Sequence, residues 1–310
     1  MLSFPDRLDA AVRRRGNPVL VGLDPRVDLI PEGMLANRIT ADWGQRATAV
    51  QTFCCRVIDV VASLVPAVKA QAAFFEQLGP PGMVSLGQVL RYAQEKGLVA
   101  ILDGKRSDIG STAQAYAEGI LGRDGQSPWG ADALTVNPYL GADSLEPFVD
   151  VAQTRGAGLF VLVKTSNPGG GMFQDLLADH RPLYQHVAAY VEGLACKTAG
   201  QCGYGSVGAV VGATYPEQLS QLRGEMPHTW FLIPGFGAQG ATARDVAPAF
   251  DPRGGGAVVN NSRGIIFAYR NRQYAERFGP GRWQEAVEAA TRQMIEELRQ
   301  NTPAGKLRET

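Results

Sequence analysis

The sequence predicts an α/β fold, a single (β/α)8 TIM barrel that spans residues 1–310. Short runs of aliphatic and β-branched residues alternate with amphipathic helical stretches, and eight such runs occur. Strands that alternate with helices pair in parallel through right-handed crossovers. Eight units in a chain of 310 residues favour a closed barrel over an open doubly wound sheet. No Pro- or Ser-rich linker divides the chain, which favours one domain.

Each predicted strand is a short apolar run between turn-forming residues. In chain order the strands are 18–24, 67–75, 99–105, 133–138, 159–166, 208–214, 230–236 and 256–262. Apolar residues at helical spacing predict the helices between them, over 46–63, 83–96, 110–121, 144–155, 182–198, 215–222 and 240–249. An extra N-terminal helix (4–15) and a final helix (281–300) flank the barrel, extended loops follow strand one (25–45) and strand five (166–181), and the tail (302–310) is expected to fray.

The charge balance excludes some partners. Lys plus Arg total 30 and Asp plus Glu total 30, so the formal net charge is zero. A protein that binds nucleic acid through bulk charge is clearly basic, so no nucleic-acid partner is expected. The apolar runs are far shorter than the roughly 20 residues that a membrane helix needs. The N-terminus also lacks the apolar core of a signal peptide, so a cytoplasmic protein is expected.

The cysteines and histidines do not predict a metal centre. Cys54 and Cys55 are adjacent in a helical stretch, and Cys196 and Cys202 lack the close paired spacing of a zinc site. The chain has only three histidines. We therefore expect reduced thiols and neither a metal nor a cofactor.

Charged residues gather at the end of the third predicted strand, in the segment 103–108 (DGKRSD). Side chains alternate faces along a strand, so Asp103 and Lys105 share a face with apolar residues of the same strand. If that face points into the barrel, both charges lie at its mouth, where the active-site residues of such barrels gather. Lys69 lies on the neighbouring strand, and Asp108 follows in the next loop.

Two interpretations of these four charges remain open. They could form a salt-bridge cluster that only fastens two strands together. They could instead be catalytic, because a lysine between carboxylates stays protonated. Such a lysine can donate a proton where a carbanion forms. In either case the network is costly to bury unless every charge is paired and hydrogen-bonded.

Two glycine-containing loops follow the last two strands, at 234–240 (PGFGAQG) and 261–265 (NSRGI). Loops at these positions of a barrel often hold a phosphate through backbone N–H groups. Arg263 adds a guanidinium for bidentate binding, and Gln239 adds an amide donor. The first loop also spells G-x-G-x-x-G, but no acidic residue follows to bind a ribose, so a dinucleotide site is rejected. Glycines that only make tight turns remain the alternative.

Together these residues resemble the orotidine 5'-phosphate decarboxylase family, most closely its longer bacterial branch, over most of the chain. Residues 103–109 (DGKRSDI) fit the family's D-x-K-x-x-D-I signature. Further segments resemble its first-strand end, second strand, pyrimidine-contacting loop and phosphate loops, at 22–25, 68–76, 164–169, 237–240 and 262–264. All of them occur in the family's order and on the expected strands.

The resemblance implies decarboxylation of orotidine 5'-phosphate to uridine 5'-phosphate, the last step of de novo pyrimidine nucleotide synthesis. It implies a reaction without metal or cofactor, through a C6 carbanion that Lys105 protonates. Lys69, Asp103, Lys105 and Asp108 would form the family's charged tetrad. Asp103 would sit close to the scissile carboxylate.

The resemblance also implies the substrate contacts and the assembly. Asp24 and Lys69 would hold ribose hydroxyls, and Ser166 would read the pyrimidine edge. The phosphate would be bound by the late loops, through Gln239, Ser262, Arg263 and Gly264. The implied assembly is a homodimer in which Asp108 and Thr112 reach the partner's site.

Two other functions remain as alternatives. A Mg-dependent sugar-phosphate decarboxylase or aldolase on the same scaffold also carries D-x-K-x-x-D, with a Glu on its second strand that helps to bind the metal. This chain has Lys69 there, which repels a divalent cation, and Glu76 lies past the strand end. A non-catalytic nucleotide-phosphate-binding protein would keep the phosphate loops but would not require the Lys–Asp array.

Overall fold

The computed structural model describes residues 2–37, 39–237 and 240–308, and in it parallel strands close into a barrel. The order around the barrel is β1-β10-β9-β8-β5-β4-β3-β2, and every neighbouring pair is parallel. The (β/α)8 prediction is therefore confirmed, with all its strands in place. The barrel strands are β1 (Val19–Leu23), β2 (Ala67–Gln71), β3 (Val99–Arg106), β4 (Ala133–Val136), β5 (Gly158–Lys164), β8 (Val207–Val211), β9 (Phe231–Ile233) and β10 (Ala257–Asn261).

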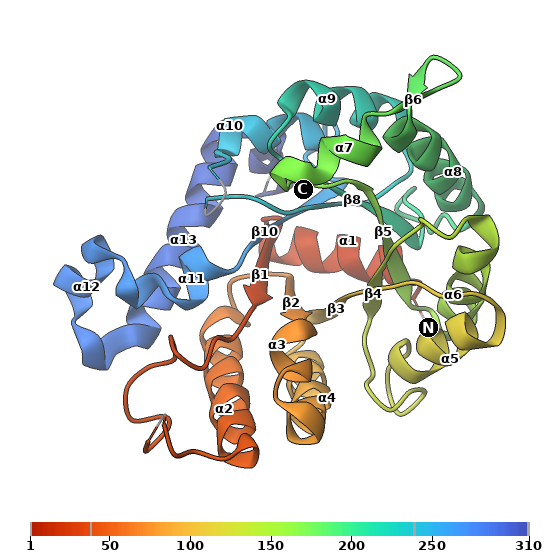
Figure 1. Cartoon of the computed structure of the whole chain (residues 1–310). Coiled ribbons are helices and arrows are strands. Elements are labelled where there is room, and N and C mark those ends of the chain that lie inside the picture. Colours follow the sequence, from red (N-terminus) through yellow and green to blue (C-terminus); the bar gives the residue numbers. More distant parts are fainter. Residues whose placement is uncertain (1, 38, 238–239, 309–310) are drawn as a thin grey trace.

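Helices surround the barrel in sequence order (Figure 1). The longer ones are α1 (Phe4–Arg15), α2 (Trp43–Val61), α4 (Gly79–Glu95), α5 (Gly110–Ile120), α6 (Ala142–Arg155), α8 (Leu183–Lys197), α9 (Pro216–Glu225) and α13 (Trp283–Asn301). Shorter ones are α3 (Ala73–Glu76), α7 (Gly171–Gln174), α10 (Ala243–Val246), α11 (Arg263–Ile266) and α12 (Arg272–Phe278), with 3-10 turns at Pro168–Gly170, Ala247–Ala249, Ala268–Arg270, Pro280–Arg282 and Pro303–Arg308. Among the described residues, no helix combines the length and apolar character needed to cross a bilayer.

The extra N-terminal helix closes the amino-terminal end of the barrel. Phe4 of α1 packs edge-on against Phe160 of β5, with ring centroids 6.0 Å apart. Gly158 opens β5 directly beneath Phe4, where a Cβ would lie 2.1 Å from the ring. Arg7 forms an ion pair of 2.9 Å with the fully buried Asp132. The amino end of the barrel is therefore covered, and the cavity described below lies at the opposite end, where the strands finish.

Helix α12 was not predicted, and three further segments differ from the sequence prediction. The second strand ends at Gln71 and not at residue 75, because residues 73–76 form the helical turn α3, which buries Phe75. The loop after β5 carries α7 and an antiparallel hairpin, β6 (Leu177–Ala178) with β7 (Arg181–Pro182). The tail does not fray within the described residues, since the 3-10 turn at Pro303–Arg308 buries Leu307.

Candidate active site

A cavity of about 290 Å³ opens at the carboxyl ends of the barrel strands. Its wall has an apolar side, formed by Leu162, Val210 and Leu232, and a polar side with charged residues. Most of the predicted site residues line it, namely Asp24, Lys69, Asp103, Lys105, Ser166, Ser262 and Arg263. The structure thus brings together residues from the first strand to the last.

Asp103 is the centre of the charged side. Its Oδ2 accepts hydrogen bonds from Lys69 Nζ at 2.8 Å and from Gln71 Nε2 at 3.0 Å. Its Oδ1 accepts from Lys105 Nζ at 2.6 Å and from Thr135 Oγ1 at 2.9 Å. A carboxylate has about four lone-pair positions, so all of them are occupied by donors. The array is fully paired, as a buried charge network must be.

Lys69 and Asp103 are buried, with exposed fractions of 4% and 7%, yet both stay charged. Burial acts to lower the pKa of Lys69, but the carboxylates of Asp103 and Asp24 outweigh it and raise the pKa. Burial acts to raise the pKa of Asp103, but the two lysine ammonium groups outweigh it and hold the pKa well below its usual range. Nearby opposite charge therefore dominates desolvation at both residues.

Lys105 adopts a strained backbone at the end of β3. Its φ is +47°, in the left-handed region that costs a non-glycine residue on the order of 1–3 kcal/mol. Its N–H donates to Thr135 Oγ1 at 2.9 Å, and the register between β3 and β4 shifts at this point. The side chain is about half exposed, at 47%, and its ammonium turns back onto Asp103. The kink therefore places a proton donor at the cavity mouth.

Asp24 and Asn260 each present an unpaired oxygen at the cavity. The Oδ1 atoms of both are buried and have no hydrogen-bond partner among the described residues. Asn260 Nδ2 donates to Ser262 Oγ at 3.3 Å, which leaves its carbonyl as the free group. A buried acceptor without a partner is unfavourable, so both oxygens suit donors from a bound ligand, such as hydroxyl groups.

Arg263 also lines the cavity. Its guanidinium forms no hydrogen bond or ion pair with the residues that the structure describes, and it is exposed to the cavity. The N–H groups of Gly237 and Gly240 donate within their own loop, and that of Gly264 donates to Asn261 Oδ1 at 3.1 Å. Among the described residues, the Arg263 guanidinium and the Ser262 hydroxyl are therefore candidate hydrogen-bond donors to an anion.

Two of the predicted phosphate contacts are not placed at the cavity. Gly264 does not line it, and Gln239 lies outside the described residues. Both remain predictions.

Ser166 is positioned by the loop that follows β5. Gln174 of α7 caps this loop, accepting from Thr165 N at 3.0 Å and donating to Thr165 Oγ1 at 2.8 Å. The buried Lys164 anchors the far side of the loop through Asp175, with Nζ and Oδ1 2.5 Å apart. Gly212 lets the loop approach, because a Cβ there would lie 2.8 Å from the Ser166 backbone.

Asp108 and Thr112 do not line the cavity of their own chain. Asp108 accepts a hydrogen bond from the N–H of Ile109 at 2.9 Å, and Thr112 is exposed in the first turn of α5. Both lie on the segment that leads from β3 into α5. Their predicted role in a partner's site stays a prediction.

Sequence reasoning missed the neutral residues that orient the charges. Gln71 shares the inward face of β2 with Lys69 two residues away, and that spacing was the available signal. Thr135 is the one hydroxyl in the apolar strand β4. Gln71 and Thr135 are uncharged, so the pattern of charged residues does not indicate them.

The donor set does not suit a divalent metal ion. Both oxygens of Asp103 are occupied by hydrogen-bond donors, and Lys69 puts a positive charge where a metal would bind. Glu76, the acid considered above, pairs with Arg106 and does not line the cavity. Mg²⁺ needs oxygen ligands with free lone pairs, so these residues fit an anion better than a cation.

Known proteins match the chain along most of its length. The family model described as "Orotidine 5'-phosphate decarboxylase / HUMPS family" matches residues 18–278. A relative named orotidine 5'-phosphate decarboxylase from Rhodopirellula baltica is 55% identical over 96% of this chain and 100% of its own. One of the same name from Caldicellulosiruptor bescii is 39% identical over 87% of this chain and 92% of its own.

A solved structure agrees with these matches. The structure titled Leishmania donovani OMP decarboxylase is 31% identical, has a TM-score of 0.74, and covers 100% of both chains. The family model matches most of the chain, and the two bacterial relatives are 55% and 39% identical to it. This chain therefore belongs to the orotidine 5'-phosphate decarboxylase / HUMPS family.

Proposed function

We propose that the chain decarboxylates orotidine 5'-phosphate to uridine 5'-phosphate, without a metal or cofactor, in the synthesis of pyrimidine nucleotides. One observation carries the proposal. The Lys105 ammonium lies 2.6 Å from the carboxylate of the buried Asp103, in a cavity that the guanidinium-bearing Arg263 also lines. The proposal is further supported by the relatives, which are named orotidine 5'-phosphate decarboxylases.

The chemistry follows from this charge arrangement. The bond between C6 and the carboxylate breaks, CO₂ leaves, and the electron pair stays on C6. Lys105 Nζ transfers a proton to that carbon and later regains one from solvent. The ammonium interacts more strongly with a carbanion than with the neutral ring, so it stabilises the transition state selectively. Asp103 orients Lys105, because its Oδ1 accepts a hydrogen bond from Lys105 Nζ.

The remaining contacts orient the substrate. In this proposal the ribose hydroxyls donate to Asp24 and lie beside Lys69, and Ser166 bonds to the pyrimidine edge. The phosphate lies against Ser262 and Arg263, with Gln239 and Gly264 as its further predicted contacts. Binding at the phosphate, remote from C6, helps to position the ring.

The test is the ultraviolet absorbance of orotidine 5'-phosphate mixed with the purified protein, with and without excess chelator. We expect a spectral change to uridine 5'-phosphate that is unaffected by the chelator. A change abolished by the chelator would contradict metal independence. Tight binding of uridine 5'-phosphate without turnover would support the non-catalytic nucleotide-binding alternative, which does not require the charged array.

The four cysteines are free, which supports the predicted cytoplasmic location.

We also propose a homodimer in which Asp108 and Thr112 complete the partner's site. Both lie outside their own chain's cavity, which supports this assignment. Asp108→Asn and Lys105→Ala chains should each be inactive alone. After unfolding and refolding as a mixture, random pairing restores about a quarter of the wild-type sites, because each mixed dimer holds one intact site. No recovery in a mixture shown to contain mixed dimers would contradict a shared site.

Replacing Arg263 by alanine should weaken binding of phosphorylated ligands. A charge-assisted pair with phosphate contributes about 3 kcal/mol, so the Kd for uridine 5'-phosphate should rise about 100-fold. Binding of uridine itself should be unchanged, which calorimetry with both ligands would measure. Arg272→Ala is the control, since Arg272 is an exposed arginine paired with Glu276. Equal affinity of Arg263→Ala and wild type for uridine 5'-phosphate would remove the phosphate assignment.

A further inference from the structure

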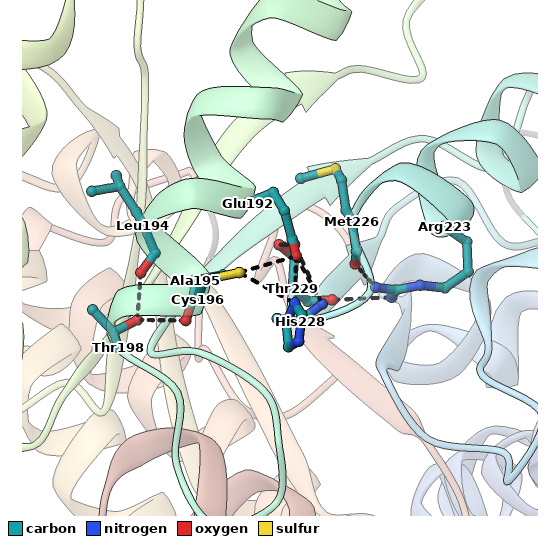
Figure 2. Close-up of polar contacts among 9 residues, drawn as sticks. All are labelled: Glu192, Leu194, Ala195, Cys196, Thr198, Arg223, Met226, His228 and Thr229. Atoms are coloured by element: carbon teal, nitrogen blue, oxygen red, sulfur yellow. Dashed lines mark hydrogen bonds and ion pairs between the residues drawn. The ribbon is translucent and has the colours of Figure 1, made fainter.

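Glu192, Cys196 and His228 gather in one cluster (Figure 2). Glu192 and Cys196 lie one turn apart near the carboxyl end of α8, and His228 lies in the turn that leads from α9 to β9. Helices of this barrel run opposite to its strands, so this cluster is near the strands' amino ends. It is separate from the proposed catalytic residues.

The three side chains direct one potential ligand atom each toward a common point. His228 Nδ1 lies 2.6 Å from Glu192 Oε1, Cys196 Sγ lies 3.2 Å from His228 Nδ1, and Cys196 Sγ lies 3.4 Å from Glu192 Oε1. Bond lengths of 2.0–2.3 Å to a tetrahedral zinc ion place such ligand atoms roughly 3.3–3.6 Å apart. The triangle therefore needs only small shifts to hold one ion.

This geometry differs from that of a nucleophilic triad. In a triad the histidine contacts the nucleophile through one ring nitrogen and the carboxylate through the other. Here the thiol and the carboxylate both meet Nδ1. A carboxylate oxygen, a thiol sulfur and a ring nitrogen that converge on one point suit a metal cation as their common partner.

The surrounding residues fix two of the three ligands. Glu192 Oε2 accepts from Thr229 Oγ1 at 2.7 Å, and the backbone N–H of His228 also donates to this carboxylate. Arg223 directs its N–H groups to the carbonyl oxygens of Thr229 and Met226, which shapes the turn that carries His228 (Figure 2). Such supporting hydrogen bonds orient ligands at metal sites.

We propose that Glu192, Cys196 and His228 bind a divalent transition metal of the zinc class, with solvent at the fourth position. The sulfur, nitrogen and oxygen donors match the ligand preferences of Zn²⁺. Cys196 is exposed and the His228 side chain is 49% exposed, so an ion can enter from solvent. Binding releases the thiol proton to water and leaves the imidazole proton on Nε2. The ion joins α8 to the turn before β9 and has a structural role.

The test is titration of the reduced, chelator-treated full-length protein with Co²⁺, followed by displacement with Zn²⁺. We expect one equivalent of Co²⁺ to produce a near-ultraviolet thiolate-to-cobalt charge-transfer band. Cys196→Ser should lose the band, and His228→Ala should weaken binding at least about tenfold. Cys202→Ser is the matched control, because it removes a half-buried thiol outside the cluster and should leave the band intact. A band that persists in Cys196→Ser, or no band in the wild type, would overturn the proposal.

A second measurement does not depend on any variant being folded. In the wild-type protein, Zn²⁺ should slow alkylation of Cys196 by iodoacetamide, as read by mass spectrometry of its peptide. Alkylation of Cys202 in the same sample should be unchanged. Equal rates at Cys196 with and without Zn²⁺ would also overturn the metal site.

Discussion

Lys105→Ala is expected to abolish turnover and leave a folded barrel. The variant removes the proton donor and the positive charge beside the developing carbanion. General acid catalysis alone contributes a factor of about 10²–10⁴, so kcat should fall by at least that much. Folding should survive because the side chain is about half exposed and Asp103 keeps its bonds from Lys69, Gln71 and Thr135. Alanine tolerates the left-handed backbone no worse than lysine, since both carry a Cβ.

The measurement is kcat from the absorbance assay, together with a thermal melt and the affinity for uridine 5'-phosphate. Lys96→Ala is the matched control, because Lys96 is a surface lysine paired with Asp59 far from the cavity residues. It should keep normal activity. Near-normal turnover by Lys105→Ala would contradict the proton-donor role, and loss of folding would show that Lys105 serves mainly as a structural ion pair.

Asp103→Ala is expected to cause the largest loss of stability among the site residues. It leaves the buried ammonium of Lys69 without its nearest counter-charge. Breaking a buried pair in this way costs about 3–5 kcal/mol, against about 0–1 kcal/mol for an exposed pair such as Asp59 with Lys96. The midpoint of urea unfolding should fall accordingly in Asp103→Ala and barely change in Asp59→Ala. Activity should also be lost.

A double variant separates lost charge pairing from lost packing. Lys69→Met with Asp103→Leu removes both charges and should recover most of the stability, but no activity. A double variant as unstable as Asp103→Ala would contradict the pairing explanation.

The pKa shifts of Asp103 and Lys69 fix how the folding stability that they contribute depends on pH. The depressed pKa of Asp103 means that its contribution is complete above the ordinary carboxyl pKa and is lost as the pH falls toward the folded-state value. The raised pKa of Lys69 means that its contribution to folding stability is lost only as the pH rises through the folded-state pKa of this lysine. The wild-type array should therefore be stable across the neutral range.

The positions of the strands could be predicted from the sequence because each is a buried apolar run between turn residues. The end of β2 could not, since the apolar residues after Gln71 read equally well as strand or as the helical turn α3. The fold of the tail depends on tertiary packing of Leu307, which leaves no local signal. Helix α12 was also missed, because it is a single short helix with few buried residues.

The charged part of the site was predictable for a physical reason. Strand alternation places Asp103 and Lys105 on one face, and Lys69 falls on the adjacent strand. The left-handed backbone of Lys105 departs from simple alternation and could not be foreseen. Nor could the meeting of Cys196 with His228, because only the barrel brings α8 beside the turn before β9.

Because α1 covers the amino end of the barrel, stability and reactivity depend on opposite ends of the strands. The amino ends of the strands, around Phe4, are buried and largely apolar apart from the Arg7–Asp132 pair, whereas the carboxyl ends carry the Lys69–Asp103–Lys105 array and the strained backbone of Lys105. Charges at the mouth contribute little net stability, so the apolar end must secure the fold. Stability and turnover therefore depend largely on different residues. Substitutions that strengthen the closed end should raise the unfolding temperature without altering the chemistry at the open one.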